Sequence, residues 1–190
     1  VVADRTVNKD DKDFSSVIDL IKPTNPQAVF FGTEFQLAGP MSKQMKDKGL
    51  NVPLMGGDGI FDDKFITLAG ANSEGDLASF PGPDVDTVPA GKAFAEAYQA
   101  AGFKDGWSAY GPTSYDAANA VINALKKSLA NATDASSARQ ATIDALATVS
   151  FDGLTGKVGF DEFGDAITKT LTVYEVKDGK WVAKKTAAVK

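Results

Sequence analysis

Short apolar runs alternate with amphipathic stretches through the first 60 residues, and this alternation restricts the fold more than any other feature of the chain. Apolar side chains recur at helical spacing across residues 11–22 and 38–49, and Pro23 ends the first pattern. Apolar runs at 26–32 and 50–57 have the length and the flanking residues of buried strands. Strands that alternate with helices are typical of a parallel sheet with crossover helices, so the sequence predicts an α/β fold.

The middle of the chain follows a different pattern, because it is rich in helices and poor in strands. Residues 81–89 contain three prolines and no apolar period, which indicates a linker or hinge. Helical patterns follow at 89–101, 112–130 and 136–148, with few strands for their apolar faces to cover. A further helix is expected at 63–70, and further strands are expected at the start of the chain, at 74–80 and at 156–165. Near the end of the chain, two runs of alternating apolar and polar residues meet in a hairpin turn at Asp178-Gly179.

Composition excludes several classes of function. The chain has neither cysteine nor histidine, which removes thiolate nucleophiles, zinc sites built on these residues and the Ser-His-Asp triad. The formal charge of −5 argues against nucleic acid as a partner, because phosphate binding needs a basic face. No apolar run approaches the roughly 18 residues that span a bilayer. We expect an exported bacterial protein whose signal peptide has been removed, since no leader pattern opens the sequence.

The stretch "GGDG" places the carboxylate of Asp58 among glycines directly after a predicted strand. Ligands of open α/β sheets bind beyond the carboxyl ends of strands, and Gly57 leaves the approach to Asp58 open. A carboxylate in that place accepts a charge-assisted hydrogen bond from an ammonium group. The alternative is structural, because Asp-Gly is also a common turn. The glycines do not form a dinucleotide or P-loop motif, so no cofactor is expected.

A second acid, Glu34, occupies the corresponding place after the preceding strand. A pair of carboxylates at one crevice is also the arrangement of glycoside hydrolases, although nothing else in the sequence favours that chemistry. The acids near Asp58 and those at 161–165 lack the spacing of a calcium-binding loop, so no metal site is expected. Tyr110 lies in a group of aromatic residues, and it forms either core or the apolar wall of a pocket.

Four segments resemble the periplasmic branched-chain amino acid binding proteins, the solute receptors of ABC importers. They are "DFSSVIDLIKPTNPQAVFFG", "GPMSKQMKDKGLNVPLMGGDGI", "YGPTSYDAANAVINAL" and "LTGKVGFDEFGD", in family order. The resemblance implies a type I periplasmic binding protein fold, in which two Rossmann-like lobes close over a ligand. It assigns residues 1–80 and 167–190 to the second lobe, which is incomplete, and residues 81–166 to the hinge and the helical part of the first lobe.

The resemblance also implies roles for individual residues. Asp58 matches the acid that binds the ammonium group of the ligand, and Tyr110 matches an aromatic residue that lines the pocket. Glu34 departs from the family, since leucine-binding members carry an aromatic residue there. Either Glu34 faces a polar or cationic ligand, or it turns away and its neighbour Phe35 takes part instead.

Family members are nearly twice as long, so the resemblance further implies a C-terminal fragment that carries about half of a binding site. The other half would come from the missing N-terminal part or from another copy, and the apolar surface left uncovered would favour association. The expected function is a non-enzymatic periplasmic receptor that presents an amino acid to an inner-membrane permease. The alternatives are a sensor domain of the same fold and a hydrolase that uses Glu34 and Asp58.

Overall fold

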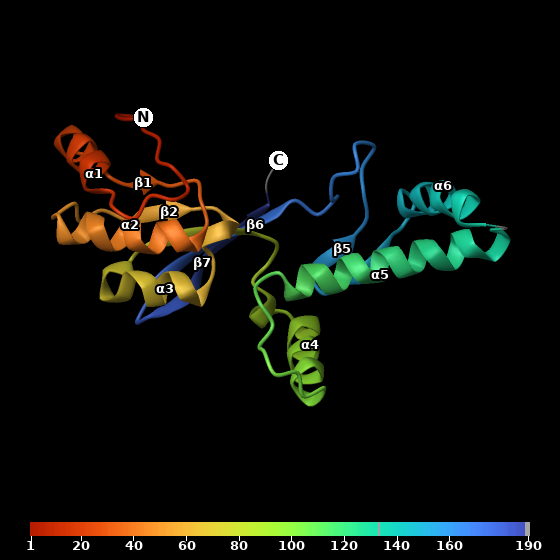
Figure 1. Cartoon of the computed structure of the whole chain (residues 1–190). Coiled ribbons are helices and arrows are strands. Elements are labelled where there is room, and N and C mark those ends of the chain that lie inside the picture. Colours follow the sequence, from red (N-terminus) through yellow and green to blue (C-terminus); the bar gives the residue numbers. More distant parts are fainter. Residues whose placement is uncertain (133, 189–190) are drawn as a thin grey trace. The chain divides into compact units, whose positions relative to one another are not determined.

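The computed structural model describes residues 1–132 and 134–188, which form two compact units (Figure 1). Unit 1 comprises Val1–Pro81 and Leu171–Ala187, and unit 2 comprises Gly82–Thr170 and Ala188. Each unit is described separately below. Among the described residues, no helix combines the length and apolar character that crossing a bilayer requires.

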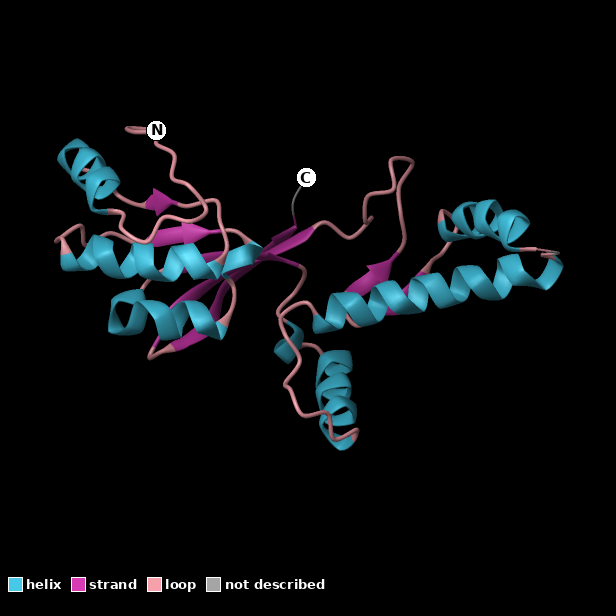
Figure 2. Ribbon diagram, in the orientation of Figure 1, coloured by secondary structure: helices cyan, strands magenta, loops and turns pink. Residues whose placement is uncertain are grey.

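Unit 1 contains a five-stranded sheet with the strand order β1-β2-β3-β6-β7, drawn in magenta in Figure 2. The first three strands are parallel, as the alternating pattern predicts, and β6 pairs with β3 in the antiparallel direction. The α/β prediction is therefore confirmed, with an antiparallel hairpin added at one side of the sheet. The strands are β1 (Val29–Phe30), β2 (Leu54–Gly56), β3 (Leu77–Pro81), β6 (Thr170–Lys177) and β7 (Lys180–Ala188).

Helices connect the parallel strands of unit 1. They are α1 (Ser15–Ile21), α2 (Phe35–Asp47) and α3 (Asp63–Ala69), with short 3-10 helices η1 (Lys22–Thr24), η2 (Asp58–Ile60) and η3 (Gly70–Ser73). Helix α1 begins later than predicted, because the Asp13 carboxylate accepts a hydrogen bond from the backbone N–H of Ser15 at 2.8 Å. Helix α2 ends as predicted, with Gly49 in the left-handed region at φ 73°. Apolar residues of these helices and strands form one core, which includes Phe14, Ile18, Met45, Leu54, Phe65 and Val176.

The predicted strand at the N-terminus is wrong. Residues 1–8 have no strand structure, although Ala3 and Val7 pack against the core. Strand β1, at the edge of the sheet, consists of Val29 and Phe30 only, and its Phe30 lines a groove together with Val1 and Val2. Such a short edge strand offers few backbone groups for a ladder, and the apolar side chains of the segment pack without regular pairing.

Unit 2 is mainly helical, and its three long helices confirm the helical patterns in the sequence. They are α4 (Pro89–Ala100), α5 (Gly111–Ser128) and α6 (Ala135–Leu146), with 3-10 helices η4 (Val85–Thr87) and η5 (Leu129–Asn131). The strand predicted at 156–165 is corrected to β5 (Gly156–Val158), which pairs with β4 (Phe151–Gly153), a strand that the sequence pattern did not indicate.

A buried carboxylate holds the turn that joins β4 to β5. Asp116 of α5 accepts hydrogen bonds from the backbone N–H groups of Leu154 and Thr155, both at 2.8 Å, and from the Thr155 hydroxyl at 2.7 Å. These bonds fix a tight turn between β4 and β5. Gly153 permits it, because a Cβ there would lie 2.5 Å from the Asp116 carboxylate.

A second buried carboxylate, Asp76, joins three elements at the amino end of β3. It accepts hydrogen bonds from the backbone N–H of Leu54 at 2.8 Å, from the Lys46 ammonium group at 2.7 Å and from the Ser42 hydroxyl. Burial raises the pKa of Asp76, and the hydrogen bonds from Lys46, Ser42 and Leu54 offset part of that rise. The arrangement ties α2 to the amino ends of β2 and β3.

We expect Lys46→Met to destabilise unit 1 by about 3 kcal/mol at pH 7, because the Asp76 carboxylate would be left buried without its cation. Since the folded-state pKa of Asp76 lies above its unfolded value, ionisation of this group opposes folding at neutral pH. The unfavourable free energy of ionising Asp76 disappears as the pH falls through its folded-state pKa. The destabilisation by Lys46→Met should therefore become smaller at acidic pH. Urea unfolding at several pH values measures it.

The matched control is Lys43→Met on the same helix, because Lys43 forms an exposed ion pair with Asp47. An exposed pair of this kind contributes little, so the change should stay within about 0.5 kcal/mol. A loss in Lys46→Met that is the same at every pH would contradict the assigned role of Asp76.

Candidate functional site

The candidate site lies where β1 and β2 end. The two strands are parallel neighbours, with Val29 paired to Leu54 and Phe30 to Met55. Their carboxyl ends therefore share one edge of the sheet, the edge at which ligands of open α/β folds bind. Glu34 precedes α2 as its N-cap residue and Asp58 opens η2, and both residues are exposed.

The loops that carry Glu34 and Asp58 touch each other through Gly59. A Cβ at Gly59 would lie 2.9 Å from the carbonyl oxygen of Thr33 and 3.5 Å from the Cα and Cγ atoms of Glu34. The structure therefore brings together the two strand-end loops that the sequence predicts to face one crevice. Only glycine at position 59 allows this approach.

The glycines around Asp58 serve close packing and not an unusual backbone conformation. None of Gly56, Gly57 and Gly59 lies in the left-handed region that favours glycine. A Cβ at Gly56 would meet the Ile60 side chain at 2.8 Å, whereas a Cβ at Gly57 would meet nothing within 4 Å. Gly57 thus faces open space beside Asp58, and the other two glycines bring the turn against its neighbours.

We expect Gly59→Ala to destabilise unit 1 by about 1–3 kcal/mol, because the added methyl group would push the loop of Asp58 away from the Thr33 carbonyl. Gly57→Ala is the matched control and should change stability by no more than about 0.5 kcal/mol. Thermal unfolding of the two variants tests this expectation. Equal effects of the two substitutions would show that the loops are not in close contact.

The Glu34 carboxylate does not cap the helix that it precedes. It makes no hydrogen bond or ion pair with the described residues, and α2 has no side-chain cap. Its neighbour Phe35 is half-buried against the core, and the Lys64 ammonium nitrogen lies 5.6 Å from the centre of its ring. Glu34 therefore presents a charged group to solvent beside the loop of Asp58, while the Phe35 ring contacts the protein.

Tyr110 belongs to unit 2, where it precedes α5 as the N-cap residue. Its side chain is 44% exposed, and its carbonyl oxygen accepts hydrogen bonds from the Thr113 hydroxyl and the Ser114 backbone N–H, both at 2.9 Å. Close by in the chain, the Phe94 ring contacts Trp107 and Tyr115 at centroid distances of 5.6 and 5.5 Å. Tyr110 thus stands at the start of a helix that carries part of an aromatic cluster.

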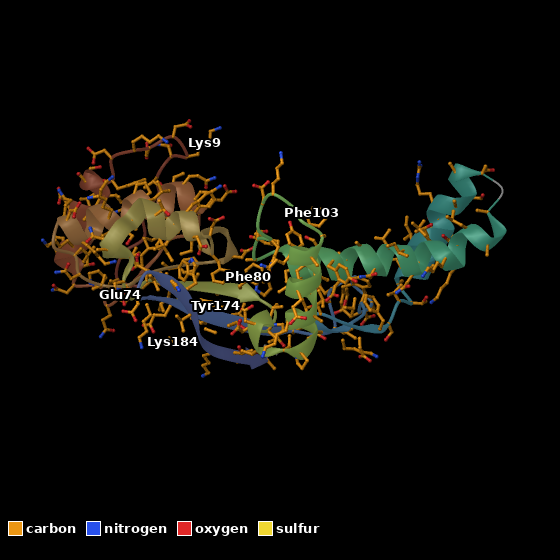
Figure 3. All side chains as sticks on the ribbon, turned by 90° about the horizontal axis from the view of Figure 1, so that it is seen from below. Lys9, Glu74, Phe80, Phe103, Tyr174 and Lys184 are labelled. Atoms are coloured by element: carbon orange, nitrogen blue, oxygen red, sulfur yellow. The ribbon has the colours of Figure 1, made fainter. Side chains whose placement is uncertain are left out.

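Sequence reasoning missed the aromatic residues that support the loop of Asp58. Phe61, at the end of that loop, stacks on Tyr174 of β6 with ring centroids 4.0 Å apart, and Tyr174 lies near Phe80 of β3 (Figure 3). Trp181 of β7 also contacts Phe61, at 5.5 Å. The alternating pattern of the last strand does indicate that Trp181 faces inward, but it does not reveal the partner.

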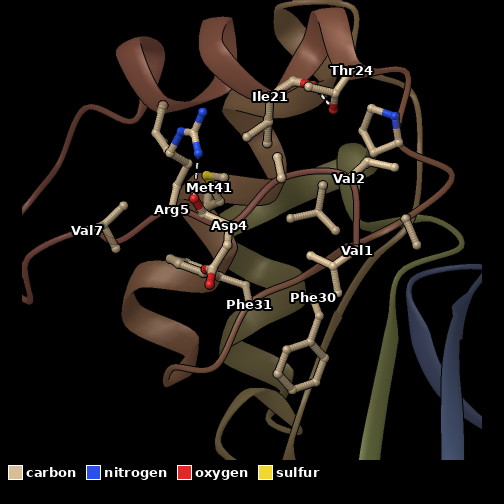
Figure 4. A pocket seen from close by; sticks show the side chains of 15 residues that line it. Val1, Val2, Asp4, Arg5, Val7, Ile21, Thr24, Phe30, Phe31 and Met41 are labelled. Atoms are coloured by element: carbon tan, nitrogen blue, oxygen red, sulfur yellow. Dashed lines mark hydrogen bonds between the residues drawn. The ribbon is translucent and has the colours of Figure 1, made fainter.

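A separate groove of about 460 Å³ lies between the N-terminal segment, α1 and β1 (Figure 4). Its lining is mainly apolar and includes Val1, Val2, Ile21, Phe30, Phe31 and Met41. None of the predicted site residues lines it. Within the described parts of the chain, no group of three or more acidic residues is placed to hold a metal ion.

Comparison with known proteins defines the class. A family model described as "Periplasmic binding protein" matches residues 1–180, and the chain belongs to this family. A leucine-, isoleucine-, valine-, threonine- and alanine-binding protein of Pseudomonas aeruginosa is 32% identical over 89% of this chain and 43% of its own length. An amino acid binding protein of the same organism is 31% identical over 92% of this chain and 45% of its own length.

Solved structures agree with the family assignment. The branched-chain amino acid transporter substrate binding protein LivJ of Streptococcus pneumoniae, in complex with isoleucine, superposes with a TM-score of 0.81 at 27% identity. That match covers 100% of this chain and 52% of LivJ. A leucine binding protein of Thermotoga maritima gives a TM-score of 0.82 at 25% identity, over 96% of this chain and 50% of its own. The resemblance read from the sequence is confirmed, and the chain spans about half the length of these relatives.

Proposed function

We propose that this chain is the ligand-binding part, about one half, of a non-enzymatic solute receptor for an amino acid. The observation that carries the proposal is the exposed carboxylate of Asp58 at the carboxyl edge of a parallel sheet, in a chain that belongs to the periplasmic binding protein family. The names of the relatives support an amino acid as the ligand, since those proteins bind leucine, isoleucine and valine.

In this proposal each site residue has a distinct task. Asp58 accepts hydrogen bonds from the ammonium group of the ligand, which enters over the open space at Gly57. Tyr110 supplies an apolar wall from the other lobe. Either Glu34 faces the part of the ligand that distinguishes one amino acid from another, or it turns away and its neighbour Phe35 takes part instead.

The receptor would work by closure of two lobes over the ligand. Residues 1–80 and 167–190 would form the second lobe, and 81–166 the hinge and the helical part of the first. The boundaries between the two compact units, at Pro81/Gly82 and Thr170/Leu171, support this division. The partners would be an N-terminal half or another copy of the chain, and a permease in the inner membrane that receives the ligand in the periplasm. No cofactor is needed.

Calorimetric titration of the full-length protein with aliphatic, polar and cationic amino acids tests the proposal. We expect saturable binding of at least one of them and no product. Asp58→Asn should weaken that binding ten- to hundredfold, because a hydrogen bond to a charged group contributes roughly 1.5–3 kcal/mol. The control is Asp63→Asn, an exposed acid at the start of α3, which should leave the affinity unchanged.

The same titration distinguishes the two orientations of Glu34. Binding of polar or cationic amino acids alone would mean that Glu34 faces the ligand, whereas binding of aliphatic ones would mean that it turns away. Unchanged affinity in Asp58→Asn would overturn the assignment of Asp58. Turnover of the ligand that Asp58→Asn abolishes would favour the hydrolase instead.

The proposed partner half can be tested through α5. Apolar side chains recur at intervals of seven residues at Tyr115 and Ile122 of α5 and at Leu129, the first residue of η5, and each is about half exposed in this chain. A helix with two apolar faces is typical of a buried position, so we infer that the rest of the receptor covers this stripe.

We expect Ile122→Ser to change the stability of the isolated chain by less than about 0.5 kcal/mol, because the side chain is 47% exposed there. In the full-length protein the same substitution should cost about 2 kcal/mol or more, since a covered isoleucine loses its burial. Denaturant unfolding of both forms measures the difference, with the exposed Lys127→Ser on the same helix as control. If Ile122→Ser destabilised the isolated chain and the full-length protein equally, the rest of the receptor would not cover these apolar side chains.

A further inference from the structure

The loop that carries Asp58 is short, and backbone hydrogen bonds within it shape its turn. The backbone N–H of Phe61 donates to the Asp58 carbonyl at 3.0 Å, and that of Asp62 donates to the Ile60 carbonyl at 2.8 Å. Beneath it, Ile60 is fully buried in the core. These bonds define the turn, but they do not by themselves fix its position relative to the sheet.

Contacts with β3 and with the C-terminal hairpin also restrain that position, in addition to the close packing of Gly59 and the burial of Ile60. The Phe61 ring stacks on Tyr174 at a centroid distance of 4.0 Å and an interplanar angle of 29°. It also lies 5.4 Å from Phe80 and 5.5 Å from Trp181, measured between ring centroids. Phe61 therefore sits among three aromatic side chains from β3, β6 and β7, of which Phe80 and Tyr174 are buried.

Trp181 adds a directional bond to this packing. Its indole N–H donates to the backbone carbonyl of Asp62 at 3.2 Å, and its ring lies 5.5 Å from that of Phe65 in α3. Asp62 in turn caps α3, because its carboxylate accepts the backbone N–H of Lys64 at 2.8 Å. One side chain of β7 thus contacts both ends of the segment that links the Asp58 turn to α3.

We propose that the β6–β7 hairpin positions Asp58 for ligand binding, with Trp181 as the positioning residue that acts through Phe61 and Asp62. This inference rests on the proposed function, because it assigns Trp181 a part in the site that Asp58 defines. A carboxylate on an exposed turn binds an ammonium group well only if the turn is held in place before the ligand arrives. The hairpin supplies this restraint from more than 100 residues further along the chain.

The first test needs no ligand. In the full-length protein, Trp181→Phe retains a ring but removes the N–H donor, so the amides of Ile60 and Phe61 should exchange with solvent about tenfold faster. Val182→Ala is the matched control, because Val182 is the next residue of β7 and is 45% exposed. It should leave those two amides unchanged. Unchanged exchange in Trp181→Phe would overturn the proposal, whatever ligand the protein binds.

The second test uses L-isoleucine as the probe, in a double-mutant cycle with Asp58→Asn. Trp181→Phe should weaken binding about tenfold in the wild-type background and by less than about twofold when Asp58 is already replaced. A residue that merely stabilises the fold would weaken binding equally in both backgrounds, and that result would overturn the proposal.

The two tests separate this inference from the proposed function. Faster exchange in Trp181→Phe together with no isoleucine binding by the wild type would uphold the contact between hairpin and loop. It would count against the proposed ligand class only. Unchanged amide exchange in Trp181→Phe together with strong isoleucine binding by the wild type would support the receptor function. It would also show that Trp181 does not position Asp58.

Discussion

The close approach of two backbone loops at Gly59 is the constraint on which the candidate site depends. Parallel pairing of β1 and β2 brings their carboxyl ends to one edge, but it does not by itself hold the loops that follow the two strands close together. Gly59 does so, because its backbone lies against the Thr33 carbonyl and Glu34. The loops that carry the two exposed acids are thereby held against each other at this edge of the sheet.

Buried and exposed carboxylates lie at opposite ends of the same sheet. At the amino ends of β2 and β3, the buried Asp76 is surrounded by an ammonium group, a hydroxyl group and a backbone N–H. At the carboxyl ends, Glu34 and Asp58 remain in water. A buried carboxylate with partners fixes the relative positions of α2, β2 and β3, whereas an exposed one contributes little to holding the elements together.

The sequence predicts the parts of this arrangement that depend on local pattern. Helical spacing and short apolar runs are enough to predict the sheet of unit 1 and the helices of unit 2. The positions of Asp58 and Glu34 after predicted strands identify them as candidate site residues. The sequence does not predict features that depend on distant contacts. The N-terminal segment reads as a strand, but residues 1–8 have no strand structure and only pack side chains such as Ala3 and Val7 against the core. The turn held by Asp116 and the packing of Trp181 on Phe61 each join residues far apart in the chain.

An exposed carboxylate is by itself a weak binding group, because water competes for its lone pairs and screens its charge. In the proposed receptor, Asp58 would therefore become effective only when a ligand and a second protein surface exclude water from it. If the turn moved freely, ordering it on binding would cost entropy, and this cost would offset much of the favourable free energy of the bond to Asp58. In the proposed receptor, the stacked ring of Phe61 and the indole bond of Trp181 would order the turn beforehand, and the remaining requirement would be a surface that closes over it.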